Sequence, residues 1–258
     1  MRKQAAQGFD SRSLRMSPTL DPGYAAGMMG KAIAVTLAVL ASANPASAFS
    51  AKSAKSWSGY VVSGTTFTAV YGAWKQPIVT CPTADARASF WIGIDGWGTG
   101  SVEQVGTWGV CSGVGKPVSY HAFWEIVGGG GKQPFAVAPG DSIEASVTFT
   151  GDAYALVVKD LTTKAQFVTQ QKCGSRPCSR ATAEWIVERP GGHPMAQYQE
   201  MVFSGLSVTA AMPPNGGITV TQVTMKNGNN VLSACSLPAN SSASKPPANI
   251  DCKWSGAQ

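Results

Sequence analysis

The stretch FWIGIDGWGTGSVEQVGTWGVC, residues 90–111, predicts a β-strand, a glycine-rich turn and a second β-strand. Because side chains alternate along a strand, Trp91 and Asp95 share one face of the first strand. Gln104 lies on the second strand, beside Val105. The stretch therefore indicates consecutive strands rather than a helix, with polar side chains at defined positions on them.

The stretch ATAEWIVERPGG, residues 181–192, alternates in the same way. One face carries Glu184 and Glu188, and the opposite face carries Trp185 and Val187. A glutamate at such a position is most often a solvated surface carboxylate. The alternation alone therefore gives Glu184 no special role.

Short strands of this kind continue along the chain, and turn signals such as PGD at 139–141 and KNGNN at 226–230 separate them. Of the 258 residues, 44% are hydrophobic and 13% charged, with 29 Gly and 16 Pro, which favours a β protein with many turns. Regularly punctuated strands predict an all-β sandwich or jelly roll of two antiparallel sheets. Because no change in composition divides residues 57–235, we expect them to form one domain.

The N-terminal region has the features of a secretory signal. Lys31 precedes the apolar run Ala32–Ala43, and the small residues Ala46-Ser47-Ala48 are typical of a cleavage site. The apolar run is too short to span a bilayer. We therefore expect residues 1–48 to be removed, residues 49–56 to form a short lead, and the protein to be secreted.

The charge of the remaining chain excludes some partners. Removing residues 1–48 takes away five basic and two acidic residues, which lowers the formal net charge from +6 to +3. A mildly basic chain without a cluster of Lys and Arg does not indicate a nucleic-acid partner. We expect a monomer with no membrane partner after removal of the signal. The sequence leaves open whether translation begins at Met1, Met28 or Met29.

Six cysteines lie after the signal, an even number that indicates disulfides in a secreted chain. Connectivity does not follow from sequence alone, but the local pairs that we expect are Cys81 with Cys111, Cys173 with Cys178, and Cys235 with Cys252. The last pair would pin a loop-like C-terminal tail, residues 236–258. A zinc site is the alternative, but the spacings are not C-x2-C and both histidines lie far from any cysteine pair.

Several catalytic classes lack their motifs. Neither His121 nor His193 lies near a recognisable nucleophile, and no G-x-S-x-G is present. The chain also lacks H-E-x-x-H, a Walker loop, and the Asp-Thr-Gly or Asp-Ser-Gly triplets of aspartic proteases. Carboxylates remain as candidate catalytic groups.

A lectin-like β-sandwich with eight Trp also permits a glycoside hydrolase. Such an enzyme needs two carboxyl groups about 5–9.5 Å apart. Glu184 and Glu188, four residues apart on one strand, are separated by roughly 13 Å, so a second carboxylate would have to come from another strand, such as Glu125. The glycoside hydrolase is the weaker alternative. A non-catalytic carbohydrate-binding module of lectin type is the other.

Five segments of the chain together resemble the glutamic peptidases, or eqolisins, a family of secreted acid proteases. The segments are SWSGYVV (56–62), FWIGIDGWGTGSVEQVGTW (90–108), SYHAFWEI (119–126), ATAEWIVERP (181–190) and FSGLSVTAA (203–211). The most specific parts are W-I-G-I-D-G followed by E-Q-V-G, and A-E-W-I-V-E. The resemblance implies a bent β-sandwich of two seven-stranded antiparallel sheets. It also implies a pepstatin-insensitive endopeptidase that acts on polypeptides without a cofactor or metal.

The catalytic pair of that family corresponds here to Gln104 and Glu184. A carboxyl group within hydrogen-bond reach of a water molecule can act as general acid or base. A Gln amide can position the same water and donate to the developing oxyanion. Because the amide is neutral, Glu184 is expected to titrate largely alone. The sequence leaves open whether Glu184 begins the cycle as base or acid.

The resemblance further suggests four substrate-binding residues that line a cleft: Trp91, Asp95, Phe123 and Glu125. Their positions on the strands agree, because Trp91 with Asp95, and Phe123 with Glu125, each share a strand face. Two departures are evident. Better-known fungal members have Trp-Tyr before the glutamate that corresponds to Glu125, where this chain has Phe123-Trp124. They also have an acidic residue shortly after the catalytic Gln, where this chain has Gly106-Thr107-Trp108. We therefore expect subsite preferences to differ.

Overall fold

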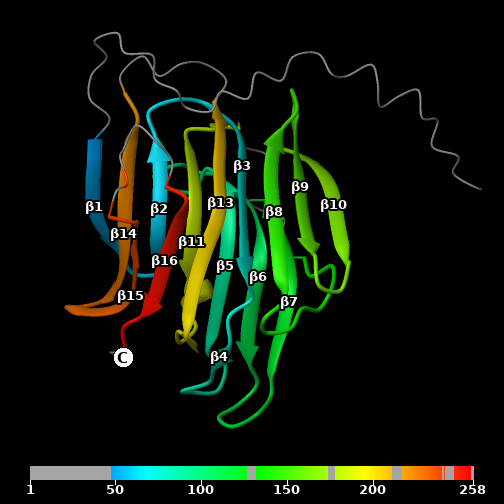
Figure 1. Ribbon diagram of the computed structural model, residues 1–258, viewed down its shortest axis with the longest axis vertical. Helices are drawn as coiled ribbons and strands as arrows, with labels where there is room; N and C mark the ends of the chain where they lie inside the picture. Colours follow the sequence, from blue (N-terminus) through cyan, green and yellow to red (C-terminus); the bar gives the residue numbers. More distant parts are fainter. Residues whose placement is uncertain are drawn as a thin grey trace, which may run out of the picture. The chain divides into compact units, whose positions relative to one another are not determined.

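The computed structural model describes residues 48–126, 132–173, 178–210, 217–239, 241 and 247–256. Regular structure in this part of the chain is almost entirely β-strand (Figure 1). The strands are β1 (Ala48–Ala54), β2 (Trp57–Ser63), β3 (Phe67–Lys75), β4 (Val79–Thr80), β5 (Arg87–Ile94), β6 (Glu103–Cys111), β7 (Val118–Ile126), β8 (Ser142–Phe149), β9 (Ala153–Asp160), β10 (Gln166–Lys172), β11 (Thr182–Glu188), β12 (Gln197–Tyr198), β13 (Glu200–Ala210), β14 (Thr219–Asn227), β15 (Asn230–Ser236) and β16 (Asn249–Trp254). A 3-10 turn, η2 (Pro190–Gly192), follows β11. Within the described ranges, no helix is both long and apolar enough to cross a membrane.

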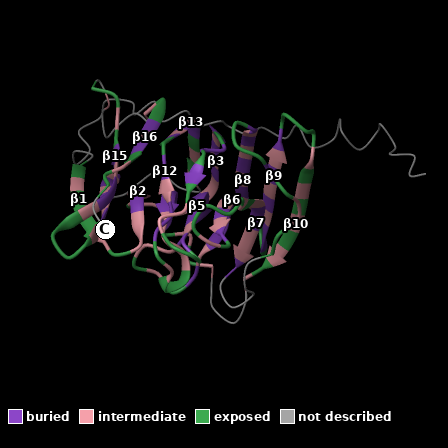
Figure 2. Ribbon diagram, turned by 90° about the horizontal axis from the view of Figure 1, so that it is seen from below, coloured by how far each residue is buried: buried purple, intermediate pink, exposed green. Residues whose placement is uncertain are grey.

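Fourteen of the described strands form one hydrogen-bonded sheet that folds over at the β14–β15 hairpin. One half has the order β1-β14-β2-β11-β5-β6-β7, and the other has the order β15-β16-β13-β3-β8-β9-β10. The halves pack face to face, with β5 and β11 against β3 and with β6 against β8 and β9. Figure 2 shows them as two layers. The all-β sandwich predicted from the sequence is confirmed, and each half has seven strands.

The strand β1 is the seventh strand of its half. It pairs in parallel with β14, from Ala48 with Thr219 to Ala54 with Met225. β15 pairs only with the C-terminal end of β14, from Met225 to Asn227. β1 therefore pairs with the rest of that edge of β14, towards Thr219. The sequence predicted only a short lead in residues 49–56 and antiparallel sheets throughout, since a parallel partner so distant in the chain leaves no local signal. The expected signal region lies outside the described residues except for Ala48.

The hydrophobic core lies between the two halves. On β11 the inward face carries Trp185, which is 2% exposed. Two indole N–H groups bond across the layers: Trp185 Nε1 donates to Tyr71 O at 3.0 Å, and Trp74 Nε1 donates to Thr107 Oγ1 at 3.1 Å. Burying a large apolar side chain contributes roughly 1.5–3 kcal/mol. The alternation therefore fixes which face of β11 turns outward.

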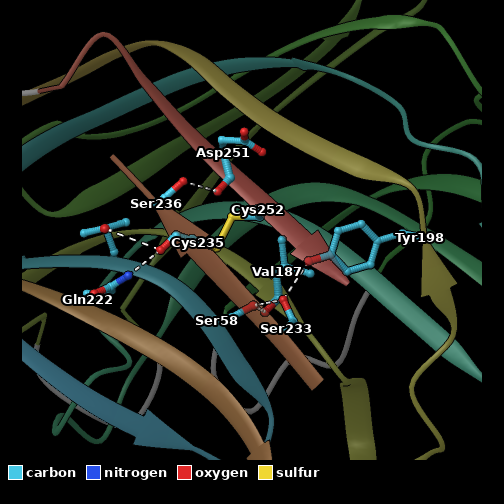
Figure 3. Close-up of a disulfide and its surroundings, with 10 residues drawn as sticks. Ser58, Val187, Tyr198, Gln222, Ser233, Cys235, Ser236, Asp251 and Cys252 are labelled. Atoms are coloured by element: carbon cyan, nitrogen blue, oxygen red, sulfur yellow. Dashed lines mark hydrogen bonds between the residues drawn. A yellow bond between two sulfur atoms is a disulfide. The ribbon is translucent and has the colours of Figure 1, made fainter. Parts of the chain in front are cut away.

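Three disulfides join the six cysteines in the expected pairs, Cys81–Cys111, Cys173–Cys178 and Cys235–Cys252. Figure 3 shows the last pair, which links β15 to β16. The segment expected to be a loop-like tail therefore includes a strand of the sheet.

A buried set of hydroxyl groups lies beside the Cys235–Cys252 disulfide (Figure 3). Ser233 Oγ is hydrogen bonded to Ser58 Oγ and, at 2.6 Å, to Tyr198 OH. These contacts join β15 to β2 and β12. The hydroxyl groups satisfy one another, as buried polar groups in native proteins generally do.

Candidate active site

One row of cross-strand neighbours brings the two predicted catalytic residues together. The row lies on the outer face of the half that contains β11, β5, β6 and β7. Glu184 on β11 lies opposite Gly93 on β5, Gly93 lies opposite Gln104 on β6, and Gln104 lies opposite Glu125 on β7. Neighbouring strands are about 4.8 Å apart, so the Cα atoms of Glu184 and Gln104 are separated by roughly 9.5 Å. The residue between them has no side chain.

The space above Gly93 is flanked by polar atoms that lack partners. A Cβ atom at Gly93 would lie 3.0 Å from Trp91 Cζ3 and 3.3 Å from Gln104 Cβ, so a side chain there would crowd the row. Gln104 Oε1 and Glu184 Oε2 are buried, and neither has a hydrogen-bond partner among the described residues. Buried polar atoms without partners are uncommon in folded proteins. Because these two oxygens lie on either side of Gly93, the space between them is suited to a molecule that donates hydrogen bonds.

The carboxyl group of Glu184 is held through one oxygen. Thr182 Oγ1 donates to Glu184 Oε1 at 2.6 Å, and Trp97 N donates to the same oxygen at 3.2 Å. Burial raises the pKa of Glu184 well above its usual range, these two hydrogen bonds lower it, and the charges of Asp95 and Glu103 raise it. The expectation that Glu184 titrates largely alone is therefore too simple, because two other acidic residues act on it.

The amide of Gln104 is held by Glu125. Gln104 Nε2 donates to Glu125 Oε2 at 3.0 Å, which fixes the orientation of the amide and leaves its second N–H available. The sequence predicted Glu125 as a substrate-binding residue. Its described contact is with the predicted catalytic amide instead.

Asp95 lies directly after β5, and its backbone has a φ of 65°. Its side chain is 0% exposed and accepts hydrogen bonds from Arg180 N at 2.6 Å, Ala181 N at 2.8 Å and Ser101 Oγ at 3.3 Å. The sequence predicted a substrate-binding residue in a cleft. In the structure the carboxylate is buried and anchors the backbone that leads into β11 and Glu184, so it presents no free oxygen to a ligand.

Trp91 and Phe123, the other predicted substrate-binding residues, share the face of Glu184 and Gln104 but are almost fully buried. Trp91 Nε1 donates to Glu188 Oε2 at 2.8 Å, and the Trp91 ring packs edge to face with Trp57. The Phe123 ring lies 5.6 Å from that of Trp108. These residues form an apolar cluster beside the row and leave little of their own surface exposed.

Three contacts of the site were not predicted from the sequence. The alternation places Thr182 on the same face as Glu184, but it does not show that the Thr182 hydroxyl donates to the carboxyl group. Glu103, next to Gln104, points into the core and is 1% exposed; burial and, to a smaller extent, the charge of Asp95 together raise its pKa to about 8. The contribution of Trp97 comes from its backbone, for which the sequence holds no signal.

A separate hollow of about 670 Å³ lies against β3, β8 and β13, on the other half of the sandwich. None of the predicted site residues is among the described residues that line it. In the described part of the chain, no group of three or more His, Cys, Asp or Glu side chains is placed to hold a metal ion.

Comparison with known families gives one match over most of the chain. The Peptidase A4 family matches residues 55–245. A search of curated proteins found no match.

Among solved structures, the fold is similar to that of Scytalido-glutamic peptidase with a peptide-based transition-state analogue, at a TM-score of 0.64 and 21% identity over 78% of this chain and 98% of that one. It is also similar to SCP-B, a member of the eqolisin family solved with the tripeptide Ala-Ile-His. The TM-score is 0.61 and the identity 21%, over 78% of this chain and 98% of that one. For aspergilloglutamic peptidase from Aspergillus niger, the TM-score is 0.52 and the identity 22%, over 66% of this chain and 99% of that one. At such identities these likenesses concern the fold.

Proposed function

The chain belongs to the peptidase A4 family, and we propose on that premise that it is a secreted acid endopeptidase that cleaves polypeptides with Glu184 and Gln104. The observation that carries the proposal is the pair of unpartnered oxygens, Gln104 Oε1 and Glu184 Oε2, on either side of the space above Gly93. A water molecule in that space would have both oxygens as hydrogen-bond partners. A peptide carbonyl next to it would be open to attack.

Glu184 begins the reaction as an acid. Its raised pKa keeps it protonated in acidic solution. Oε1 already accepts two hydrogen bonds, so the proton resides on Oε2. Oε2 gives this proton to the carbonyl oxygen of the substrate while the water attacks the carbonyl carbon. It then takes a proton from the attacking water, so the intermediate is a neutral gem-diol.

The same oxygen completes the cleavage. Oε2 of Glu184 protonates the amide nitrogen, the C–N bond breaks, and one hydroxyl group of the gem-diol returns its proton to Oε2. The products are a carboxylic acid and an amine. Glu184 ends protonated, as it began, so the cycle needs no cofactor.

Gln104 assists both steps through its amide. Oε1 accepts a hydrogen bond from the attacking water, and the N–H that Glu125 does not use donates to the carbonyl oxygen as it gains charge. A single preorganised donor of this kind is worth about 3–4 kcal/mol in the transition state. Glu125 thereby acts as a positioning residue for the amide.

Substrate entry requires movement of the connection between β5 and β6. Trp97 N bonds Glu184 Oε1, and the Trp97 ring lies 6.4 Å from that of Trp57, so this connection covers the carboxyl group. Gly96 and Gly98 have positive φ angles of 123° and 70°. We expect this connection to move away from Glu184 when a polypeptide binds.

The disulfides support a place of action outside the cell. All six cysteines are paired, and disulfides persist in oxidising compartments. Secretion through the N-terminal signal would bring the chain to such a compartment.

Hydrolysis of a denatured protein at a pH of about 3–5 tests the proposed function. The wild type should release peptides with pepstatin or a chelator present. Glu184→Gln and Gln104→Ala should each lower kcat by about 100-fold or more without changing the circular dichroism spectrum. Glu200→Gln, an exposed residue of β13, is the matched control and should retain activity.

Near-normal activity in either Glu184→Gln or Gln104→Ala would refute the assignment of the pair. Inhibition of the wild type by pepstatin or by the chelator would point to another class of protease. Binding of a polysaccharide without any hydrolysis would favour the carbohydrate-binding module.

A further inference from the structure

We propose that the face carrying Glu184 and Gln104 also has a specificity subsite for a side chain that accepts hydrogen bonds, a carboxamide or a carboxyl group, formed by Ser89, Trp108 and His121. The inference rests on the proposed peptidase function and specifies part of its substrate. It concerns a region about four residues along the strands from the catalytic row.

The three residues are direct cross-strand neighbours. Ser89 on β5 lies opposite Trp108 on β6, and Trp108 lies opposite His121 on β7. Ser89 precedes Gly93 by four residues and Trp108 follows Gln104 by four, so all three lie on the outer face. The distance from the catalytic row is roughly 13 Å, which an extended peptide spans in about four residues. A substrate side chain on either side of the cleaved bond could therefore reach them.

Two polar atoms of this group have no described partner. Ser89 Oγ and Trp108 Nε1 are both buried without a hydrogen bond to any described residue, and Ser89 is 2% exposed. His121 is partly exposed, and its Nε2 lies 2.7 Å from Ser119 Oγ. Unsatisfied buried donors are costly, and a bound group that accepts their hydrogen bonds would remove the cost.

The chemistry of the group selects an acceptor. The indole N–H of Trp108 can only donate, and the hydroxyl of Ser89 and the ring of His121 can each donate as well. Glu188, opposite Ser89, already accepts the hydrogen bond of Trp91 Nε1, and burial raises its pKa, which favours its protonated form. A lysine or arginine side chain would find no free carboxylate beside these donors.

An apolar wall next to these donors suits a longer side chain. The rings of Trp108 and Phe123 lie 5.6 Å apart at an interplanar angle of 32°. The methylene groups of Gln or Glu can pack on this wall while their terminal oxygen reaches the donors. Trp108 lies in the segment Gly106-Thr107-Trp108, where the sequence departs from the better-known fungal members.

Matched peptides test the subsite. Each peptide carries Gln, Glu, Leu or Lys at one position, scanned over four positions on each side of the cleaved bond. For the wild type, kcat/KM with Gln and Glu should exceed that with Leu and Lys by roughly three- to tenfold at one position. A preference for Gln alone identifies the carboxamide as the ligand. An equal preference for Gln and Glu identifies the terminal carbonyl oxygen that both side chains have.

The variants Trp108→Phe and Ser89→Ala should bring the ratio of Gln to Leu towards one. Trp254→Phe, on β16 in the other half, removes an indole N–H elsewhere and should leave the ratio unchanged. The affinity of the same peptides for the Glu184→Gln variant is also measured, because binding does not require hydrolysis.

The two measurements separate the two proposals. Selective binding to Glu184→Gln with no hydrolysis by the wild type would overturn the peptidase function and support the subsite. Hydrolysis with no preference at any position would overturn the subsite. A preference that persists in both Trp108→Phe and Ser89→Ala would overturn it as well.

Discussion

The two faces of β11, β5 and β6 carry opposite chemistry although both are buried. The inner face bears Trp185, Ile92 and Val105, which pack among apolar neighbours. The outer face bears Glu184 and Gln104, which are 0% and 6% exposed and have oxygens without described partners. The inner face therefore fixes the position of the strands, and the outer face presents reactive groups at that position. Stability and activity should accordingly be separable by mutation.

Glu103 is the exception on the inner face, and its replacement should have the largest effect. The pKa of Glu103 is about 8 in the folded chain because of burial, against about 4.3 for an exposed glutamate. The folded state keeps this proton where the unfolded state has lost it, so stability falls as pH rises from about 4.3 to 8. The loss by pH 8 is on the order of 5 kcal/mol. Glu103→Gln should abolish this part of the slope.

Urea unfolding of the wild type and of Glu103→Gln at about pH 5 and pH 8 measures this effect. Equal slopes of stability against pH in the two proteins would show that Glu103 is already ionised in the folded state.

Trp185→Ala tests the inner face directly. Removing this side chain should lower the free energy of unfolding by about 3–5 kcal/mol, because it leaves a cavity and unpairs Tyr71 O. Gln104→Ala, on the outer face, should lower it by much less. Denaturant unfolding of both variants gives the comparison, and similar losses would mean that the two faces do not have separate roles.

Gly93→Ala should reduce activity rather than stability. The added Cβ would lie 3.0 Å from Trp91 Cζ3 and 3.3 Å from Gln104 Cβ, so it would displace the Trp91 ring and Gln104, and a misplacement of about 1 Å can cost about 100-fold in rate. Gly109→Ala is the matched control, because its Cβ would meet Val79 Cγ2 at a similar 3.0 Å on the inner face. Measured kcat/KM should fall only in Gly93→Ala; normal activity there would exclude this space as the reaction site.

Much of this arrangement could be predicted from the sequence. The alternation around Trp185 indicated which residues of β11 share a face with Glu184, and the resemblance supplied Gln104 from a distant strand. The sandwich followed from the strand punctuation. The three disulfides are the expected local pairs, although the connectivity does not follow from the sequence alone.

Other features depend on contacts that the sequence does not encode locally. The parallel pairing of β1 with β14 joins distant segments, and the hydrogen bond of Trp97 N to Glu184 depends on the backbone of a connection. Asp95 was predicted to share a strand face with Trp91, but it lies directly after the end of β5, and its backbone has a φ of 65°. Its carboxylate accepts hydrogen bonds from Arg180 N and Ala181 N.

Thr182→Val should produce the smallest effect. The hydrogen bond from Thr182 Oγ1 lowers the pKa of Glu184, so its loss should raise that pKa further. Because the protonated form is the active one, the decline of kcat/KM on the alkaline side should move to higher pH. A decline that moves to lower pH would contradict the assignment of the working proton to Glu184.

The most direct test of the account follows the carboxyl group of Glu184 itself. Its titration, recorded by carbon NMR with Glu184→Gln to assign the signal, is compared with kcat/KM over the same pH range. We predict a titration above the ordinary glutamate range of about 4.3, with kcat/KM falling as Glu184 loses its proton. Titration in the ordinary range, or a kcat/KM that rises as that proton is lost, would contradict the account.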